Sequence, residues 1–320
     1  MKVTRQMLHK DLRRYYTPAS LTEKIMRRKT TTRLMNLLIN KVLRGRTVSG
    51  LDCREIYVPS SDGECRIRTI IFKPADAPPD LPVMLFLHGG GYITGLPEMY
   101  TDLIEGFIRA RPCVVVAPDY RKAFTKPFPA GFNDCYDTLL WLRGHGDAIG
   151  VNPGKLIIAG TSAGGGLTAA VTLKARDTMD MSVAFQMPLY GMIDDRQPFD
   201  PARQIESPAW GTATNLFGWQ SYLAGIIKEG AEVPAYASPA RNHDYSDFPP
   251  TITFVGSLDP FLHETTAYVE ELKQAGIPTE FRIYEGCFHG FDQIAPNTSV
   301  GKDALDFMYS SYCKYYDRYM

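Results

Sequence analysis

The sequence lacks long apolar runs, a cysteine framework and the short motifs of metal and nucleotide sites. It contains no run of about 18 apolar residues, and its first residues lack the apolar core of a secretory signal, so we expect a cytoplasmic protein without stable membrane anchoring. Its six cysteines form no C-x-x-C pair and are expected to be reduced thiols. No H-E-x-x-H or G-x-G-x-x-G motif occurs, so we expect no metal and no cofactor.

Charge sums to zero but is unevenly distributed. Residues 1–46 contain thirteen Lys or Arg against only Asp11 and Glu23, so this segment carries about +11 and the remainder about −11. We interpret it as basic helices lying on an acidic body. Attraction to anionic membranes or acidic substrates and an Arg-rich transit peptide are the open alternatives. No nucleic-acid partner is expected, because the segment lacks an RNA- or DNA-binding motif.

The order of elements indicates an α/β protein with a mostly parallel central sheet flanked by helices. Residues 8–45 are predicted to form two helices, with Leu34, Leu37, Leu38 and Val42 near one face. Strand-like runs on both sides of the turn SSDG predict an antiparallel pair. Mostly apolar runs then alternate with helical segments, as in a sheet buried on both faces. These runs are VMLFL, CVVVAP, KLIIAG, SVAFQMPLY, TITFVG and TEFRIYEG.

Residues 191–250 interrupt this alternation with aromatics, prolines and glycines. We predict an insertion there, lying over the strand ends. The expected division is an N-terminal helical segment at 1–50 and a catalytic α/β domain at 51–320 that contains the insertion.

A serine set among glycines follows one of the apolar runs. The stretch LIIAGTSAGGGLTAA contains G-x-S-x-G at residues 160–164, between a predicted strand and a predicted helix. On so tight a turn, side chains two residues before or after the serine would collide with backbone, so glycine is needed at both places. The pattern predicts that Ser162 is a nucleophile, and the alternative is a turn that only packs a helix closely against a strand.

A serine hydroxyl needs a neighbouring base to take its proton. Among the six histidines, His289 follows the last strand-like run and is the predicted base. Asp259 follows the run TITFVG and is the predicted carboxylate that orients it. Glu264 and Asp292 are lower-ranked alternatives, and a helix-capping role for Asp259 stays open.

The stretch LHGGGYITG supplies the fourth element. His88-Gly89-Gly90-Gly91 follows the run VMLFL, and such a loop offers N–H groups with no side chains in the way. The amides of Gly89, Gly90 and Ala163 would together bind the oxyanion of a tetrahedral intermediate.

These motifs resemble those of the hormone-sensitive-lipase family of α/β-hydrolase esterases. HGGGY, GTSAGG, Asp259-Pro260 and His289-Gly290-Phe291 occur in the family's order, and the resemblance runs from about Leu51 to the C-terminus. It implies the α/β-hydrolase fold, a catalytic triad and an oxyanion hole at the residues named above, and a cap made of the N-terminal helices and the insertion. Family members are often dimers, so a homodimer is an option here. One departure is DYRKAFTKPFPA, where relatives carry DYRLAPE and then PFPA; it puts loop packing in doubt more than activity.

The expected function is a serine carboxylesterase acting on a small-molecule ester with a short- to medium-chain acyl group or an aryl group. Aromatic residues of the insertion, together with Tyr92, would form a lid that suits compact esters, or would simply be the core of the cap. They are Trp210, Phe217, Trp219 and Tyr222. The alternatives are an amide or acetyl hydrolase with the same triad and a non-catalytic binding protein on the same fold.

Overall fold

The protein is built on one eight-stranded sheet, described here in a computed structural model of residues 1–320. The strand order is β1-β2-β4-β3-β5-β6-β7-β8. From β1 to β8 the strands are Leu51–Pro59, Arg66–Pro74, Leu81–Leu87, Val114–Pro118, Val151–Thr161, Val183–Leu189, Thr251–Gly256 and Thr279–Tyr284. The β1–β2 and β2–β4 pairs are antiparallel, and every other pair is parallel. The predicted mostly parallel sheet is confirmed.

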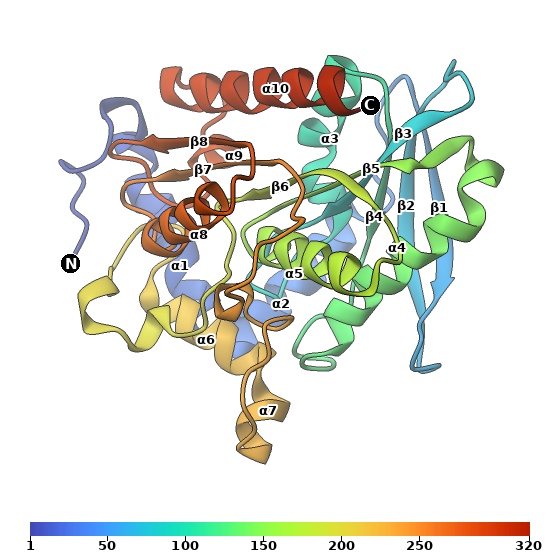
Figure 1. The fold of residues 1–320 in the computed structure, drawn as a ribbon. Coiled ribbons are helices and arrows are strands. Elements are labelled where there is room, and N and C mark those ends of the chain that lie inside the picture. The colour runs from blue at the N-terminus through green and yellow to red at the C-terminus, as the bar shows by residue number, and fades with distance from the viewer.

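Helices cover both faces of the sheet. Helices α3 and α10 lie on one face and α4, α5 and α8 on the other (Figure 1). The helices α1 to α10 are Tyr16–Met26, Lys29–Leu43, Thr101–Ala110, Ala130–Ile149, Ala163–Thr178, Thr212–Tyr222, Ala224–Glu229, Leu262–Gln274, Phe291–Ile294 and Ser299–Tyr319. Short 3-10 helices cover Lys10–Tyr15, Pro97–Tyr100, Gln197–Phe199, Pro201–Arg203 and Pro239–Arg241. None of the helices is long and apolar enough to cross a membrane.

Strand β3 shows why its sequence reads as a continuous apolar run. All seven of its residues are buried. Met84 and Phe86 belong to the core cluster under α3 and α10, whereas Val83 and Leu85 belong to the cluster under α4 and α5. Because successive side chains of a strand point to opposite faces, a strand covered on both sides must be apolar at every position.

The N-terminal residues form two helices, as predicted, but the apolar face of the second helix points outward. On α2, Leu34, Leu37, Leu38 and Val42 are 61–69% exposed. The opposite face holds the helix in place: Asn36 Nδ2 donates to the carbonyl of Ile93 at 2.9 Å, and the Thr94 hydroxyl donates to Asn36 Oδ1. Helix α2 therefore lies on the loop that follows β3 and leaves its leucines uncovered.

The insertion after β6 carries α6 and α7 and several short turns. It lies beside the N-terminal helices, as Figure 1 shows at the lower left, where Thr214 of α6 donates to the Glu23 carboxylate of α1 at 2.7 Å. The C-terminal helix α10, for which the sequence analysis made no prediction, covers the sheet over β6, β7 and β8. The six cysteines are free, as expected.

Candidate active site

Ser162 lies on a sharp turn between β5 and α5. Its φ is +56°, a conformation that costs a residue with a side chain of order 1–3 kcal/mol. Neighbouring backbone passes so close that a Cβ on Gly164 would lie 1.9 Å from the Leu87 carbonyl oxygen, and one on Gly160 would lie 2.4 Å from the Gly164 carbonyl oxygen. A side chain at either position would collide with backbone, so both glycines are required, as the sequence motif predicts.

Three side chains from three separate loops meet at this turn. His289 Nε2 lies 2.8 Å from Ser162 Oγ, and His289 Nδ1 lies 2.8 Å from Asp259 Oδ2. The serine follows β5, the aspartate follows β7 and the histidine follows β8, so all three stand at the carboxyl ends of parallel strands. The exposed fractions are 7% for Ser162, 8% for His289 and 3% for Asp259. The arrangement lets the imidazole accept the hydroxyl proton while the carboxylate holds its other nitrogen.

The two alternative acids have other partners. Glu264 Oε1 accepts hydrogen bonds from the N–H groups of Ile193 and Asp194 at 2.8 and 3.2 Å. Asp292 Oδ2 accepts a hydrogen bond from the Tyr190 hydroxyl at 3.1 Å. Asp259 also accepts the N–H of Phe261 through Oδ1 at 2.9 Å, so its second oxygen supports the start of α8. The structure thus places Asp259, and neither alternative, on His289.

The oxyanion donors differ from the expectation at one position. The N–H of Gly89 donates to the Tyr100 hydroxyl at 3.1 Å, inside the protein. The N–H groups of Gly90 and Ala163 have no acceptor in the chain. Ala163 is the first residue of α5, whose N-terminal end carries partial positive charge. Gly90 and Ala163 are therefore the two predicted donors that the structure leaves free.

Behind this loop, the buried ring of His88 contacts the half-buried Lys122, a residue that the sequence analysis did not single out. His88 Nδ1 lies 2.8 Å from the Gly89 carbonyl oxygen, and its Nε2 lies 3.0 Å from Lys122 Nζ. Burial, aided by the nearby Lys122 cation, lowers the pKa of His88 to about 3, so the ring is neutral. Since an ammonium can only donate, Nε2 accepts and Nδ1–H donates to Gly89.

Lys122 is held in turn by Asp119, whose Oδ1 lies 2.9 Å away, and by the Tyr120 carbonyl oxygen at 2.5 Å. This lysine stands in the stretch DYRKAF, where the chain departs from its relatives. This departure from the family pattern was the only feature of the sequence that drew attention to Lys122, and it suggested a change in loop packing. The structure connects it to the glycine loop beside Ser162.

The aromatic residues of the insertion divide into two groups. Trp219 and Tyr222 pack on Tyr92, with ring centroids 5.5 and 3.9 Å away, and all three are buried. Trp210 instead lies beside the catalytic loop, 6.3 Å from the His289 ring centroid, and a Cβ on Gly91 would lie 2.1 Å from its Cη2. The first group packs within the core, and Trp210 lies against the glycine loop and near His289.

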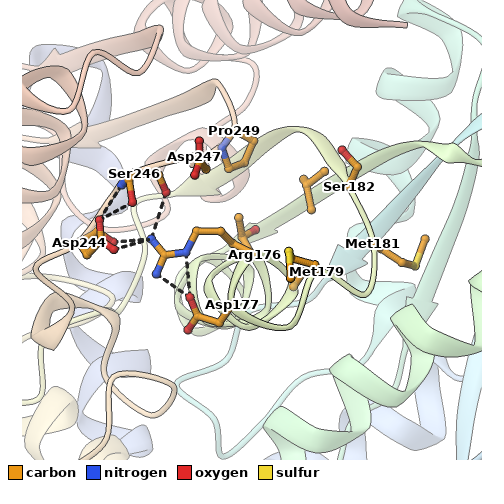
Figure 2. A pocket seen from close by; sticks show the side chains of 12 residues that line it. Arg176, Asp177, Met179, Met181, Ser182, Asp244, Ser246, Asp247 and Pro249 are labelled. Atoms are coloured by element: carbon orange, nitrogen blue, oxygen red, sulfur yellow. Dashed lines mark hydrogen bonds and ion pairs between the residues drawn. The ribbon is translucent and has the colours of Figure 1, made fainter.

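A surface pocket of about 540 Å³ lies away from these residues, at the end of α5 (Figure 2). Its Arg176 is already bound by Asp177 Oδ1 and by the carbonyls of Asp244 and Ser246, as Figure 2 shows. The one cation that lines this pocket is therefore already paired within the chain. No group of three or more His, Cys, Asp or Glu side chains in the chain is placed to hold a metal ion.

Comparisons with known proteins fit this geometry. A family model described as alpha/beta hydrolase fold matches residues 84–293, about two thirds of the chain. Esterase LipI of Mycobacterium tuberculosis is 29% identical over 228 residues, which cover 70% of this chain and 71% of that protein. An arylesterase of Saccharolobus solfataricus is 28% identical over 244 residues, 75% of this chain and 77% of that protein.

A solved structure of a bacterial heroin esterase superposes with a TM-score of 0.87 at 28% identity. The superposition covers 98% of this chain and 99% of that one. The likeness therefore includes the N-terminal helices and the insertion as well as the sheet.

The buried carboxyl of Asp292 generates a prediction about pH. Burial raises its pKa from 3.8 to about 6, so between these values the folded protein holds a proton that the unfolded chain releases. This contribution to stability is present at low pH and is lost as the pH rises to about 6. Asp292→Asn should remove this pH dependence, so that wild type loses about 2 kcal/mol of unfolding free energy relative to the variant between about pH 4 and pH 7.

Urea unfolding at the two pH values measures this difference. Asp306→Asn, at an exposed position of α10, serves as the control and should follow wild type. Parallel curves for wild type and Asp292→Asn would show that Asp292 is not protonated in the folded protein.

Proposed function

The chain belongs to the hormone-sensitive-lipase family of α/β hydrolases, and from this premise we propose that Ser162, His289 and Asp259 hydrolyse carboxylic esters as a catalytic triad. The activity itself, carboxylic ester hydrolysis, is that of the relatives named above. One observation carries the assignment of residues: a single imidazole lies 2.8 Å from the serine oxygen through one nitrogen and 2.8 Å from a buried carboxylate through the other.

The proposed mechanism follows from these positions. His289 Nε2 takes the proton of Ser162 as its oxygen attacks the ester carbonyl, and Asp259 stabilises the imidazolium. The oxyanion that forms accepts hydrogen bonds from the N–H groups of Gly90 and Ala163. His289 then protonates the leaving alcohol. In the second half of the reaction His289 takes a proton from water as the water oxygen attacks the acyl carbon, and it returns this proton to Ser162 Oγ as the bond to the serine breaks and the carboxylic acid leaves.

We propose compact substrates, such as short- to medium-chain or aryl esters. Trp210 contacts Gly91 of the glycine loop and lies near His289, so a bulky aromatic ring borders the place where the acyl or alcohol group must lie. The N-terminal helices and the insertion would act as the cap over this space. Amide substrates need the same triad, and a complete set of triad residues argues against a binding protein that has lost its chemistry.

Replacing the serine tests the proposal directly. Ser162→Ala should lower kcat/KM for p-nitrophenyl acetate by about 10⁴-fold or more, because the hydroxyl is the nucleophile. Rates should fall along the series acetate, butyrate, octanoate and palmitate if Trp210 limits the acyl group. Ser182→Ala, at an exposed serine, is the control. If wild type and Ser162→Ala are equally inactive on every ester, anilide substrates come next, and inactivity there too favours a binding protein.

The identity of the triad acid is tested by a matched pair of substitutions. Asp259→Asn should lower kcat by about 10³- to 10⁴-fold, because the amide no longer stabilises the imidazolium or holds the correct tautomer. Asp292→Asn should leave kcat within a few-fold of wild type, since its carboxylate is bound by Tyr190. The opposite ranking of the two variants would assign the role to Asp292.

Lys122 is predicted to position the glycine loop. Lys122→Met removes the cation that fixes the His88 tautomer, and with it the hydrogen bond from His88 to the Gly89 carbonyl. The same peptide group carries the Gly90 N–H, so its displacement should lower kcat about ten- to hundredfold with KM little changed. Lys122→Arg should restore part of kcat. The control is Lys126→Met, which removes a lysine paired with Asp62 and Glu64 on the surface. A change confined to KM or to unfolding free energy would contradict a positioning role.

A further inference from the structure

Helix α2 exposes a row of aliphatic side chains that the rest of the protein does not cover. Leu34, Leu37, Leu38 and Val42 follow helical spacing and are each more than 60% exposed. Single exposed leucines are common, but four on one face of one helix form an apolar patch, and such patches on soluble domains mark interaction sites.

The position of the helix is set by its other face. Thr32 is fully buried, and Asn36 binds both Ile93 and Thr94 of the loop after β3. Rotating α2 to bury its leucines would break these contacts and expose Thr32. The outward direction of the leucines is therefore part of the fold, and Figure 1 shows α2 with α1 and α6 on the side away from α10.

Cations accompany the apolar row and have no acidic partners. Residues 29–43 contain no Asp or Glu. Lys41 falls within the row and Arg33 along one edge by helical spacing, and Arg44 follows directly as the C-cap residue of the helix. None of the three forms an ion pair with the chain. The nearby basic residues that are paired lie outside residues 29–43: Arg27 binds Glu23, and Arg46 binds Asp102.

We propose that α2 docks reversibly on an anionic lipid surface, with its leucines entering the headgroup boundary and its cations contacting lipid phosphates. A helix with one apolar face and a basic, acid-free remainder has the chemistry of an interfacial helix. Lys41 reaches the headgroups from within the apolar row because its long aliphatic stem lies along the leucines. Each such cation adds about 1 kcal/mol at an anionic surface.

The charge also favours a lipid surface over a second copy of the chain. In a two-fold dimer built on this face, Arg33, Lys41 and Arg44 of one copy would meet the same residues of the other. Like charges brought together in this way oppose association. An anionic bilayer buries the apolar row and pairs the cations with lipid phosphates at the same time.

Vesicle flotation tests the proposal and does not depend on the proposed esterase activity. Wild type should float with vesicles of equal parts phosphatidylcholine and phosphatidylglycerol at low salt, should float far less at high salt, and should not float with phosphatidylcholine alone. Leu37→Ser/Leu38→Ser should weaken binding about tenfold or more, and so should Lys41→Gln/Arg44→Gln.

The matched control removes two exposed aliphatic side chains elsewhere. Met179→Ser/Ile283→Ser should bind vesicles as wild type does. All variants should give the far-UV circular dichroism spectrum and the urea unfolding midpoint of wild type, which shows that they are folded. The proposal is overturned if wild type fails to bind anionic vesicles, if both α2 variants bind as wild type, or if light scattering shows a dimer that Leu37→Ser/Leu38→Ser turns into a monomer without vesicle binding.

Discussion

The close crossing of strand β3 with the turn between β5 and α5 is the constraint on which the site depends. At Gly164 the chain passes so near the Leu87 carbonyl that no side chain fits, and this contact holds Ser162 in its positive-φ conformation. The same crossing brings the loop after β3 beside the first amides of α5. The nucleophile and the two free N–H groups are therefore positioned by one piece of backbone packing, and the energy of the strained residue is offset by the sheet around it.

Around this turn, the protein excludes water and replaces it with fixed partners. Ser162, His289 and Asp259 come from loops after three different strands, and each is almost fully buried. Behind the glycine loop, the neutral ring of His88 donates to the Gly89 carbonyl oxygen, and the Lys122 cation donates to the other nitrogen of that ring. Preorganised dipoles of this kind act on developing charge without having to reorient during the reaction.

Helix α2 links the glycine loop to the surface of the protein. The inner face of α2 binds the loop that carries the glycines, and its outer face presents leucines and unpaired cations. Most of the basic residues of the N-terminal segment form no ion pair with the rest of the chain. The interpretation of this segment as basic helices held on an acidic body accounts for only a few pairs, such as Arg46 with Asp102.

The sequence by itself determined the apolar strands and the serine turn, because both depend on local rules. It indicated Asp259 and His289 by their places after strands, but only the tertiary structure brought them to Ser162. Continuous apolar runs predict strands covered on both faces, and the glycines around Ser162 follow from steric limits within five residues. Tertiary structure alone decided that Gly89 donates to Tyr100, that Lys122 contacts His88 and that the leucines of α2 face outward. These contacts join segments that are distant in the chain. Helical spacing shows which side chains share a face, but only packing against the rest of the molecule decides which face is covered.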